Sequence, residues 1–169
     1  MDTQKVLRSE LSALLRSGNA HMDFDEIVSD FPLEHINDKA INMPYSFWQI
    51  IEHMRIAQWD ILEFIRDPEH VSPHYPEGYR PNPREIADEA RWSRTLAGFR
   101  SDLAALDRMV QSPDTDLFSP IPHAKKYNIF REILLAADHN GYHMGELAII
   151  RQVMDLWPAG RKYLTGTPE

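Results

Sequence analysis

The chain has 169 residues, of which 43% are hydrophobic and 26% are charged, so it is long enough and apolar enough to form a globular domain with its own core. It contains no cysteine, which excludes disulfides, zinc sites built on thiolates and cysteine nucleophiles. Its net charge of −8 argues against nucleic acid as a partner, because phosphate binding requires a basic surface. No apolar run approaches the roughly 20 residues of a membrane span, and none follows the polar start at Met1, so we expect a cytoplasmic protein with no membrane contact.

The first predicted helix covers residues 3–17, where leucines recur at helical spacing. Thr3 is its expected cap and Gly18 its stop. A shorter helix is expected over residues 21–31. Pro32 ends it, because proline lacks the amide hydrogen that a continuing helix requires.

A second long helix is predicted from residue 47 to residue 66. Ser46 and Gln49 form a capping box at its start, in which a serine side chain and a glutamine three residues later satisfy free backbone groups. His53 falls at the flank of the apolar stripe of this helix. A histidine in such a place is usually a half-buried, hydrogen-bonded side chain, so it needs a partner before it indicates a site.

Residues 67–83 hold five of the twelve prolines, and no helix survives that density of proline. The segment is predicted to be a long loop, and loops of this length are often lids or dimer contacts. It also carries His70 and His74. We do not expect these two histidines to be ligands, because a loop fixes side-chain geometry poorly.

The third long helix is expected to begin near Pro83 and to end before Pro113, with an apolar stripe that runs from Trp92 to Val110. Glu85 and Glu89 precede this stripe. They either form a solvated first turn or reach into a pocket at the end of the helices. Residues 112–127 are predicted to form a second irregular connection.

The last helix is predicted from Asn128 to about Leu156, followed by a loose tail over residues 158–169. His139 and His143 lie four residues apart, which places them one turn apart on the same face. Two imidazoles in that arrangement can bind one divalent metal. The H-x-x-x-H pattern is weak evidence by itself, because most histidines are solvated or line the edge of a core.

Four long amphipathic segments without alternating apolar runs predict an all-α protein. An antiparallel four-helix bundle buries four such stripes, so we expect a single domain over residues 1–169 with its core at about 3–157. The long connections before the second and the fourth helix permit crossovers, so a simple up-and-down order is not required.

If the second and last helices are neighbours, His53, His139 and His143 converge. Three imidazoles around a divalent ion leave one position open for water or substrate, and the ion lowers the pKa of bound water to about 7. Asp138, Glu52 and Glu146 are near enough in sequence to accept a ring N–H, and Glu146 could equally be a fourth ligand. The spacings of di-iron bundles, zinc proteases, P-loops and serine hydrolases are all missing.

At these residues the sequence resembles the DinB/YfiT-like family. The resemblance rests on SFWQIIEH at residues 46–53 and DHNGYHMGEL at residues 138–147, and it covers nearly the whole chain. It implies a four-helix bundle of unusual topology, often dimeric, in which His53, His139 and His143 hold nickel or zinc. It also implies relatives that act as thiol-dependent S-transferases or isomerases. The sequence departs from the family at Glu146, where relatives often carry glutamine.

Two functions are compatible with these patterns. The first is a metal-dependent transferase or hydrolase that uses the ion, with or without a low-molecular-weight thiol, to attack an electrophilic small molecule. Glu146 or a carboxylate of the third helix would then handle a proton. The second is a non-catalytic dimeric binding module, in which the metal is structural or absent and the tryptophans serve packing and an interface. A closed ion site would favour the second, and an open position on the floor of a pocket would favour the first.

Overall fold

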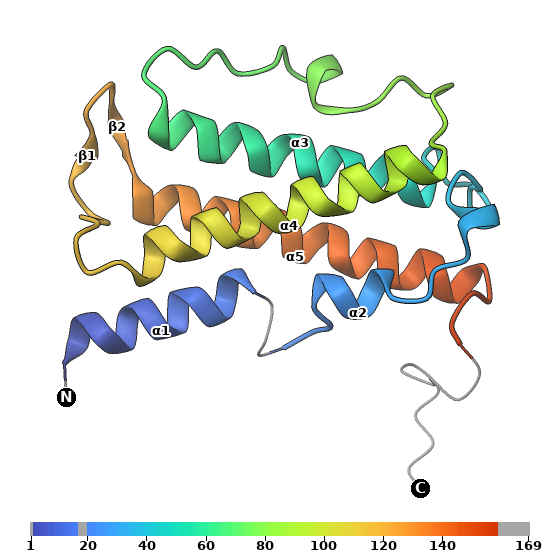
Figure 1. Ribbon diagram of the computed structural model, residues 1–169, viewed down its shortest axis with the longest axis horizontal. Coiled ribbons are helices and arrows are strands. Elements are labelled where there is room, and N and C mark those ends of the chain that lie inside the picture. Colours follow the sequence, from blue (N-terminus) through green and yellow to red (C-terminus); the bar gives the residue numbers. More distant parts are fainter. Residues whose placement is uncertain (1, 17–19, 159–169) are drawn as a thin grey trace, which may run out of the picture.

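The computed structural model describes residues 2–16 and 20–158, and it is mostly helical, as predicted (Figure 1). Its helices and strands are α1 (Thr3–Leu15), α2 (Phe24–Val28), α3 (Phe47–Arg66), α4 (Glu89–Gln111), β1 (Pro120–Ile121), β2 (Ala124–Asn128) and α5 (Ile129–Val153). Short 3-10 turns cover Leu33–His35 and Glu77–Tyr79. The predicted stop at Gly18 and all but the first residue of the predicted tail lie outside the described residues.

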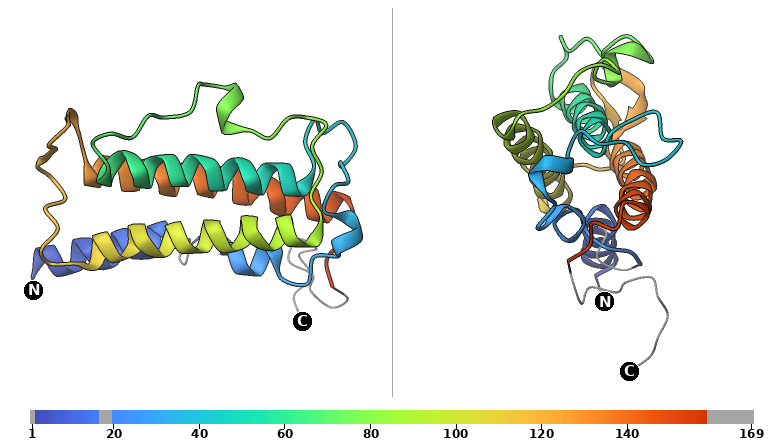
Figure 2. Two further views of the ribbon diagram at one scale, coloured as in Figure 1. Left: turned by 45° about the horizontal axis from the view of Figure 1, so that its top comes forward. Right: turned by 90° about the vertical axis from the view of Figure 1, so that its right-hand side faces the viewer.

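The long helices lie side by side, with α3 against α4 and α5, and with α1 against the same two helices (Figures 1 and 2). Helices α3 and α4 run in the same direction, since the Trp48 indole donates to Thr95 near their starts and the Gln58 amide donates to the Phe99 carbonyl further along. Helix α5 runs the opposite way to α3 (Figure 1).

The crossover between the two parallel helices is the proline-rich segment. Two helices that run the same way can be joined only by a connection that returns along their length, and residues 67–88 make this return beside α3 (Figure 1). The sequence pointed instead to the connections before the second and fourth long helices. Residues 67–83 are irregular as predicted, apart from the turn at Glu77–Tyr79.

Local capping signals set most helix starts. Ser46 and Gln49 form the predicted capping box at the start of α3, and Asp23 forms another with Glu26 at the start of α2. Asp2, rather than Thr3, caps α1, because its carboxylate accepts from the main-chain N–H groups of the first turn.

Helix α4 begins later than its sequence suggested. Pro83 is a typical first-turn residue, but the backbone groups that follow it are used in contacts with other segments. The Gln49 side-chain amide donates to the carbonyls of residues 82, 83 and 85, and the Asn37 side chain bonds both backbone groups of Ala87. Asp88 then caps the helix by accepting from the N–H of Arg91.

The connection before α5 contains an unpredicted hairpin. Strands β1 and β2 pair antiparallel, and the side chain of Ile121, in β1, is buried. Strands this short carry too few residues to show a period of two in the sequence. His123 anchors the hairpin to α3 through its Nε2 atom, which lies 2.8 Å from the Phe64 carbonyl oxygen.

The core is divided along the helices into two clusters of apolar side chains. One lies around Trp48, Phe99 and Met144, and the other around Leu11, Leu106 and Ile133. Trp48 and Trp92 are buried in the first cluster, so they serve packing within the chain rather than an interface. Within the described residues, every helix is too short or too polar to cross a lipid bilayer.

Candidate metal centre

His53 enters the site from α3, two turns after the helix begins. The buried side chains of Phe47, Ile50, Ile51 and Met54 fix the rotation of this helix, which leaves His53 half-buried on the face toward α5. Its Nδ1 atom lies 2.7 Å from the carbonyl oxygen of Tyr79 in the crossover. A carbonyl can only accept, so Nδ1 carries the proton and Nε2 of a neutral His53 presents its lone pair.

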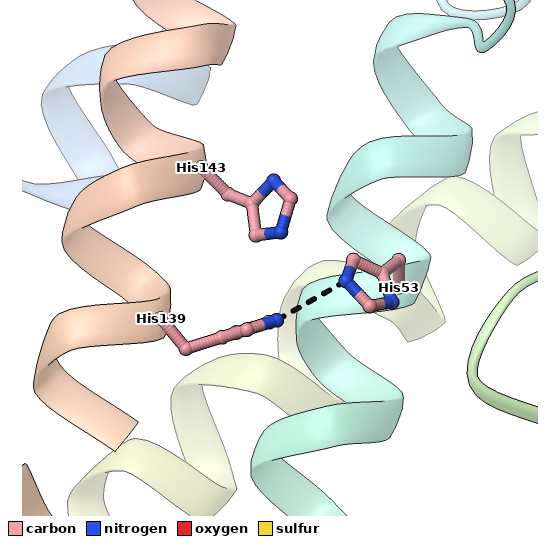
Figure 3. Close-up of side chains that lie close together, drawn as sticks. All are labelled: His53, His139 and His143. Atoms are coloured by element: carbon pink, nitrogen blue, oxygen red, sulfur yellow. Dashed lines mark hydrogen bonds between the residues drawn. The ribbon is translucent and has the colours of Figure 1, made fainter. Parts of the chain in front are cut away.

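His139 and His143 enter from α5, one turn apart, and their rings point toward His53 (Figure 3). The buried residues Ala136, Asn140, Met144 and Leu147 define the inner face of this helix. Both histidines flank that face, as their spacing predicted. His143 is buried, whereas His139 is half-buried.

The three imidazoles form a compact cluster. The Nε2 atoms of His53 and His139 are 3.1 Å apart, and the ligand atoms of all three histidines lie within 4.8 Å of one another. Two nitrogens bound to one ion at about 2.0–2.1 Å would lie roughly 3–3.4 Å apart, which is close to this separation. Glu146 is not a member of the cluster.

Two of the three histidines have a hydrogen-bond acceptor for their second ring nitrogen. The Nδ1 atom of His143 lies 2.7 Å from a carboxylate oxygen of Glu146. Asn140 is close enough to His139 to act on its pKa, and its buried Oδ1 atom has no partner of standard hydrogen-bond geometry among the described residues. The Tyr79 carbonyl at His53 and the Glu146 carboxylate at His143 suit histidines whose Nε2 atoms bind a metal, because a ligating imidazole donates its other N–H to such a group.

Burial favours the neutral forms of His53 and His139. Desolvation lowers the pKa of His53, and the hydrogen bond to Tyr79 opposes this only in part. Desolvation, followed by repulsion from His143 and His53, lowers the pKa of His139 to about 4. Both side chains are therefore uncharged at neutral pH, which is the state in which an imidazole can bind a metal. The donor set thus fits a divalent ion.

A pocket opens beside the cluster. It has an empty volume of about 390 Å³ and is lined by Tyr45, Gln49, Ile50, His53, Arg80, Tyr142, His143 and Glu146. Because His53 and His143 form part of its wall, a small molecule in this pocket would contact these two histidines.

The other carboxylates considered from the sequence lie elsewhere. Glu52 accepts from Arg55 and Thr95 on the side toward α4, and Asp138 is exposed. Glu85 pairs with Arg91, and Glu89 is exposed at the start of α4. Only Glu146 reaches the histidines and the pocket among these candidates.

The sequence did not indicate the contribution of the crossover. Asp60 is buried and binds two residues of that segment: His70 Nε2 lies 2.7 Å from one of its carboxylate oxygens, and the Tyr79 hydroxyl donates to the other over 2.6 Å. A signal existed, since Asp60 follows His53 by two helical turns and lies on the same face. The Tyr79 carbonyl is a main-chain group, and no side-chain pattern could identify it.

A model of the DinB superfamily matches residues 18–147, a segment that covers more than half of the chain and includes all three histidines. No curated protein and no solved structure matches the chain. The three histidines of the two segments that carry the resemblance, residues 46–53 and 138–147, lie within the matched range and form one cluster. The chain therefore belongs to the DinB superfamily.

Proposed function

We propose that this protein is a metal-dependent enzyme in which His53, His139 and His143 hold a divalent ion, nickel or zinc, at the wall of a small-molecule pocket. The observation that supports this most strongly is the convergence of three imidazoles from two helices, with a hydrogen-bond acceptor beside the Nδ1 atoms of His53 and His143. Membership of the DinB superfamily adds to it. We also propose that the four long helices form the bundle of a single domain.

When bound, the ion supplies Lewis acidity, which lowers the pKa of a thiol or water at its open position. The pocket residues then bind and orient an electrophilic small molecule against that nucleophile. Glu146 is our candidate for the proton. One of its oxygens accepts from His143, and the carboxylate also lines the pocket, where it can take the proton that the nucleophile loses. The reaction class is transfer to a low-molecular-weight thiol, or hydrolysis.

The first test of this proposal is ion content. Protein purified without added metal should hold about one equivalent of nickel or zinc, measured by mass spectrometry of the metal, and His143→Ala should hold less than about a tenth of that. His74→Ala is the matched control, since the His74 side chain is exposed in the crossover and pairs with the exposed Glu77, outside the cluster of three histidines. Absence of the ion from the wild type, or its retention in His143→Ala, would contradict the proposed site.

The second test is activity. Loaded protein should accelerate the conjugation of a thiol with a fluorogenic electrophile, or the hydrolysis of an activated ester, and chelation should abolish the effect. Glu146→Gln should lower the rate by about a hundredfold while ion content stays near that of the wild type, because it removes a proton acceptor but not a ligand. An unchanged rate in this variant would remove Glu146 from the mechanism.

A homodimer is part of the proposal. Helix α5 exposes several large apolar side chains on the side away from the core, namely Leu134, Leu135, Tyr142, Ile149 and Val153. Such a stripe supports an interface between two copies. Ile149→Glu should convert a dimer into a monomer in light-scattering measurements. Glu10→Lys is the control, since Glu10 is an exposed residue of α1. A monomeric wild type would overturn this part alone.

A further inference from the structure

Arg80 is held at the rim of the pocket by the residues on either side of it. Tyr79 is fixed at both ends, since its carbonyl accepts from His53 and its hydroxyl donates to the buried Asp60. On the other side Pro81 is buried. The backbone that carries Arg80 is therefore anchored against α3, although the side chain itself is exposed.

The Arg80 side chain lines two neighbouring pockets. It lies over the ring of Tyr45, 4.7 Å from the ring centre, and both residues line the pocket beside the histidines as well as the shallow depression next to it. The aromatic contact holds the flat group without using its N–H donors. Arg80 is thus part of the wall of both pockets.

The charge of Arg80 is not neutralised within the described residues. Arg55 and Arg91 pair with Glu52 and Glu85, whereas no described carboxylate forms an ion pair with Arg80. Its charge acts on the metal centre, since it contributes to the lowered pKa values of His53 and His139. Glu146 is the one described acidic side chain that lines the pocket, and it already accepts from His143.

We propose that Arg80 binds an anionic group, a carboxylate, on the small molecule that reacts at the histidine cluster. The planar fork of a guanidinium matches a carboxylate with two parallel hydrogen bonds. The substrate class is then a small acid with its reactive group toward His53 and His143 and its carboxylate toward the crossover. This inference rests on the proposed metal centre, and it adds to that centre the feature that selects among small molecules.

The test uses cobalt-loaded protein and pairs of thiols of equal length, one with a terminal carboxylate and the other with a terminal hydroxyl. Mercaptopropionate, mercaptobutyrate and mercaptohexanoate carry a carboxylate, and the mercaptoalcohols of the same lengths do not. A thiolate bound to cobalt gives a charge-transfer absorption band, so titration of that band measures affinity without any turnover. The wild type should bind the best-fitting acid about tenfold more tightly than its alcohol, the gain of a charge-assisted hydrogen-bonded pair.

Three variants separate the causes. Arg80→Gln should abolish the preference for the acid without changing cobalt content or affinity for the alcohol, and Arg80→Lys should keep part of the preference. Arg84→Gln is the matched control, because Arg84 is an exposed arginine of the same segment and does not line the pocket; it should behave as the wild type.

The outcomes distinguish this inference from the proposed function. Equal affinity for acid and alcohol in the wild type, or a preference that persists in Arg80→Gln, would overturn the role of Arg80 and leave the metal centre standing. Failure of the wild type to bind cobalt would overturn both.

Discussion

The Nδ1 atom of His53 lies 2.7 Å from the main-chain oxygen of Tyr79, so the crossover between α3 and α4 is tied directly to the histidine cluster. The same tyrosine is bound through its hydroxyl to Asp60, which also holds His70. Desolvation and the bond to Asp60 raise the pKa of Tyr79 to about 12, so the hydroxyl remains a donor at all ordinary pH values. The position of His53 therefore depends on a carboxylate that does not touch it.

Asp60→Ala should weaken the binding of zinc to the protein by about tenfold, because partners of metal-binding histidines contribute that much when they are lost. The change releases Tyr79 and His70 together, so the Tyr79 carbonyl no longer fixes the His53 ring. Competition with a chromophoric zinc indicator measures the effect. Asp67→Ala is the control, since the side chain of this exposed aspartate accepts from the backbone N–H of Glu69 rather than from Tyr79 or His70. A variant that melts earlier yet binds zinc as the wild type does would show that Asp60 acts on stability alone.

The stability of the metal-free protein should fall as the pH drops from 6.5 toward 4. Both His53 and His139 have folded-state pKa values below the ordinary 6.5, so the unfolded chain takes up protons over this interval and the folded chain does not. Stability is then fully present above 6.5 and is lost on acidification, with a slope that approaches about 1.4 kcal/mol per pH unit for each histidine kept neutral. Solvent reduces that slope, because His139 is only half-buried.

Urea titrations at several pH values measure this slope, and the informative quantity is the difference between the wild type and His139→Gln. The variant lacks the histidine whose pKa is lowered to about 4, so its stability should depend less on pH over the same interval. Carboxylates that titrate near pH 4 are common to both proteins and cancel. Parallel curves would show that His139 is not kept neutral by burial.

Gln49→Leu should lower the free energy of unfolding by about 2 kcal/mol, because it leaves loop carbonyls without their donor in a buried place. The Gln49 side chain donates to three carbonyls in residues 82–85 and accepts from the backbone of Ser46. Hydrogen exchange should quicken at residues 82–88 in particular. Gln4→Leu, on the exposed face of α1, should stay within about 0.5 kcal/mol of the wild type. Equal losses in the two variants would point to a general effect of leucine.

Gly145→Ala should raise the free energy of unfolding by about 1 kcal/mol, the usual gain for this change inside a helix. A methyl group at this position meets no atom within 4 Å. At Gly141 the same group would come within 3.4 Å of His21 Nε2, so the gain there should be smaller. Thermal and urea unfolding compare the two. A loss of stability at Gly145 would indicate that another chain covers this face in solution, beside the exposed Tyr142 and Ile149.

The parts of the structure that the sequence revealed are those determined by neighbours along the chain. The capping box at Ser46, the apolar stripes and the spacing of His139 and His143 all act within one or two turns of helix. The start of α4 and the acceptor for His53 could not be predicted, because both depend on contacts between distant segments. Gln49 and Asn37 bind the backbone before α4, and the Tyr79 carbonyl reaches His53 across 26 positions of sequence.

The parallel orientation of α3 and α4 has a consequence for how such proteins diversify. A return connection as long as a helix must pass beside α3, so the fold supplies a stretch of irregular chain along the flank that carries His53. Few of its side chains belong to the core, and substitutions there change what meets an incoming molecule while the helices that bear the histidines keep their packing. Substitutions in the crossover can therefore change which substrates are accepted, without any change in the packing of α3 and α5.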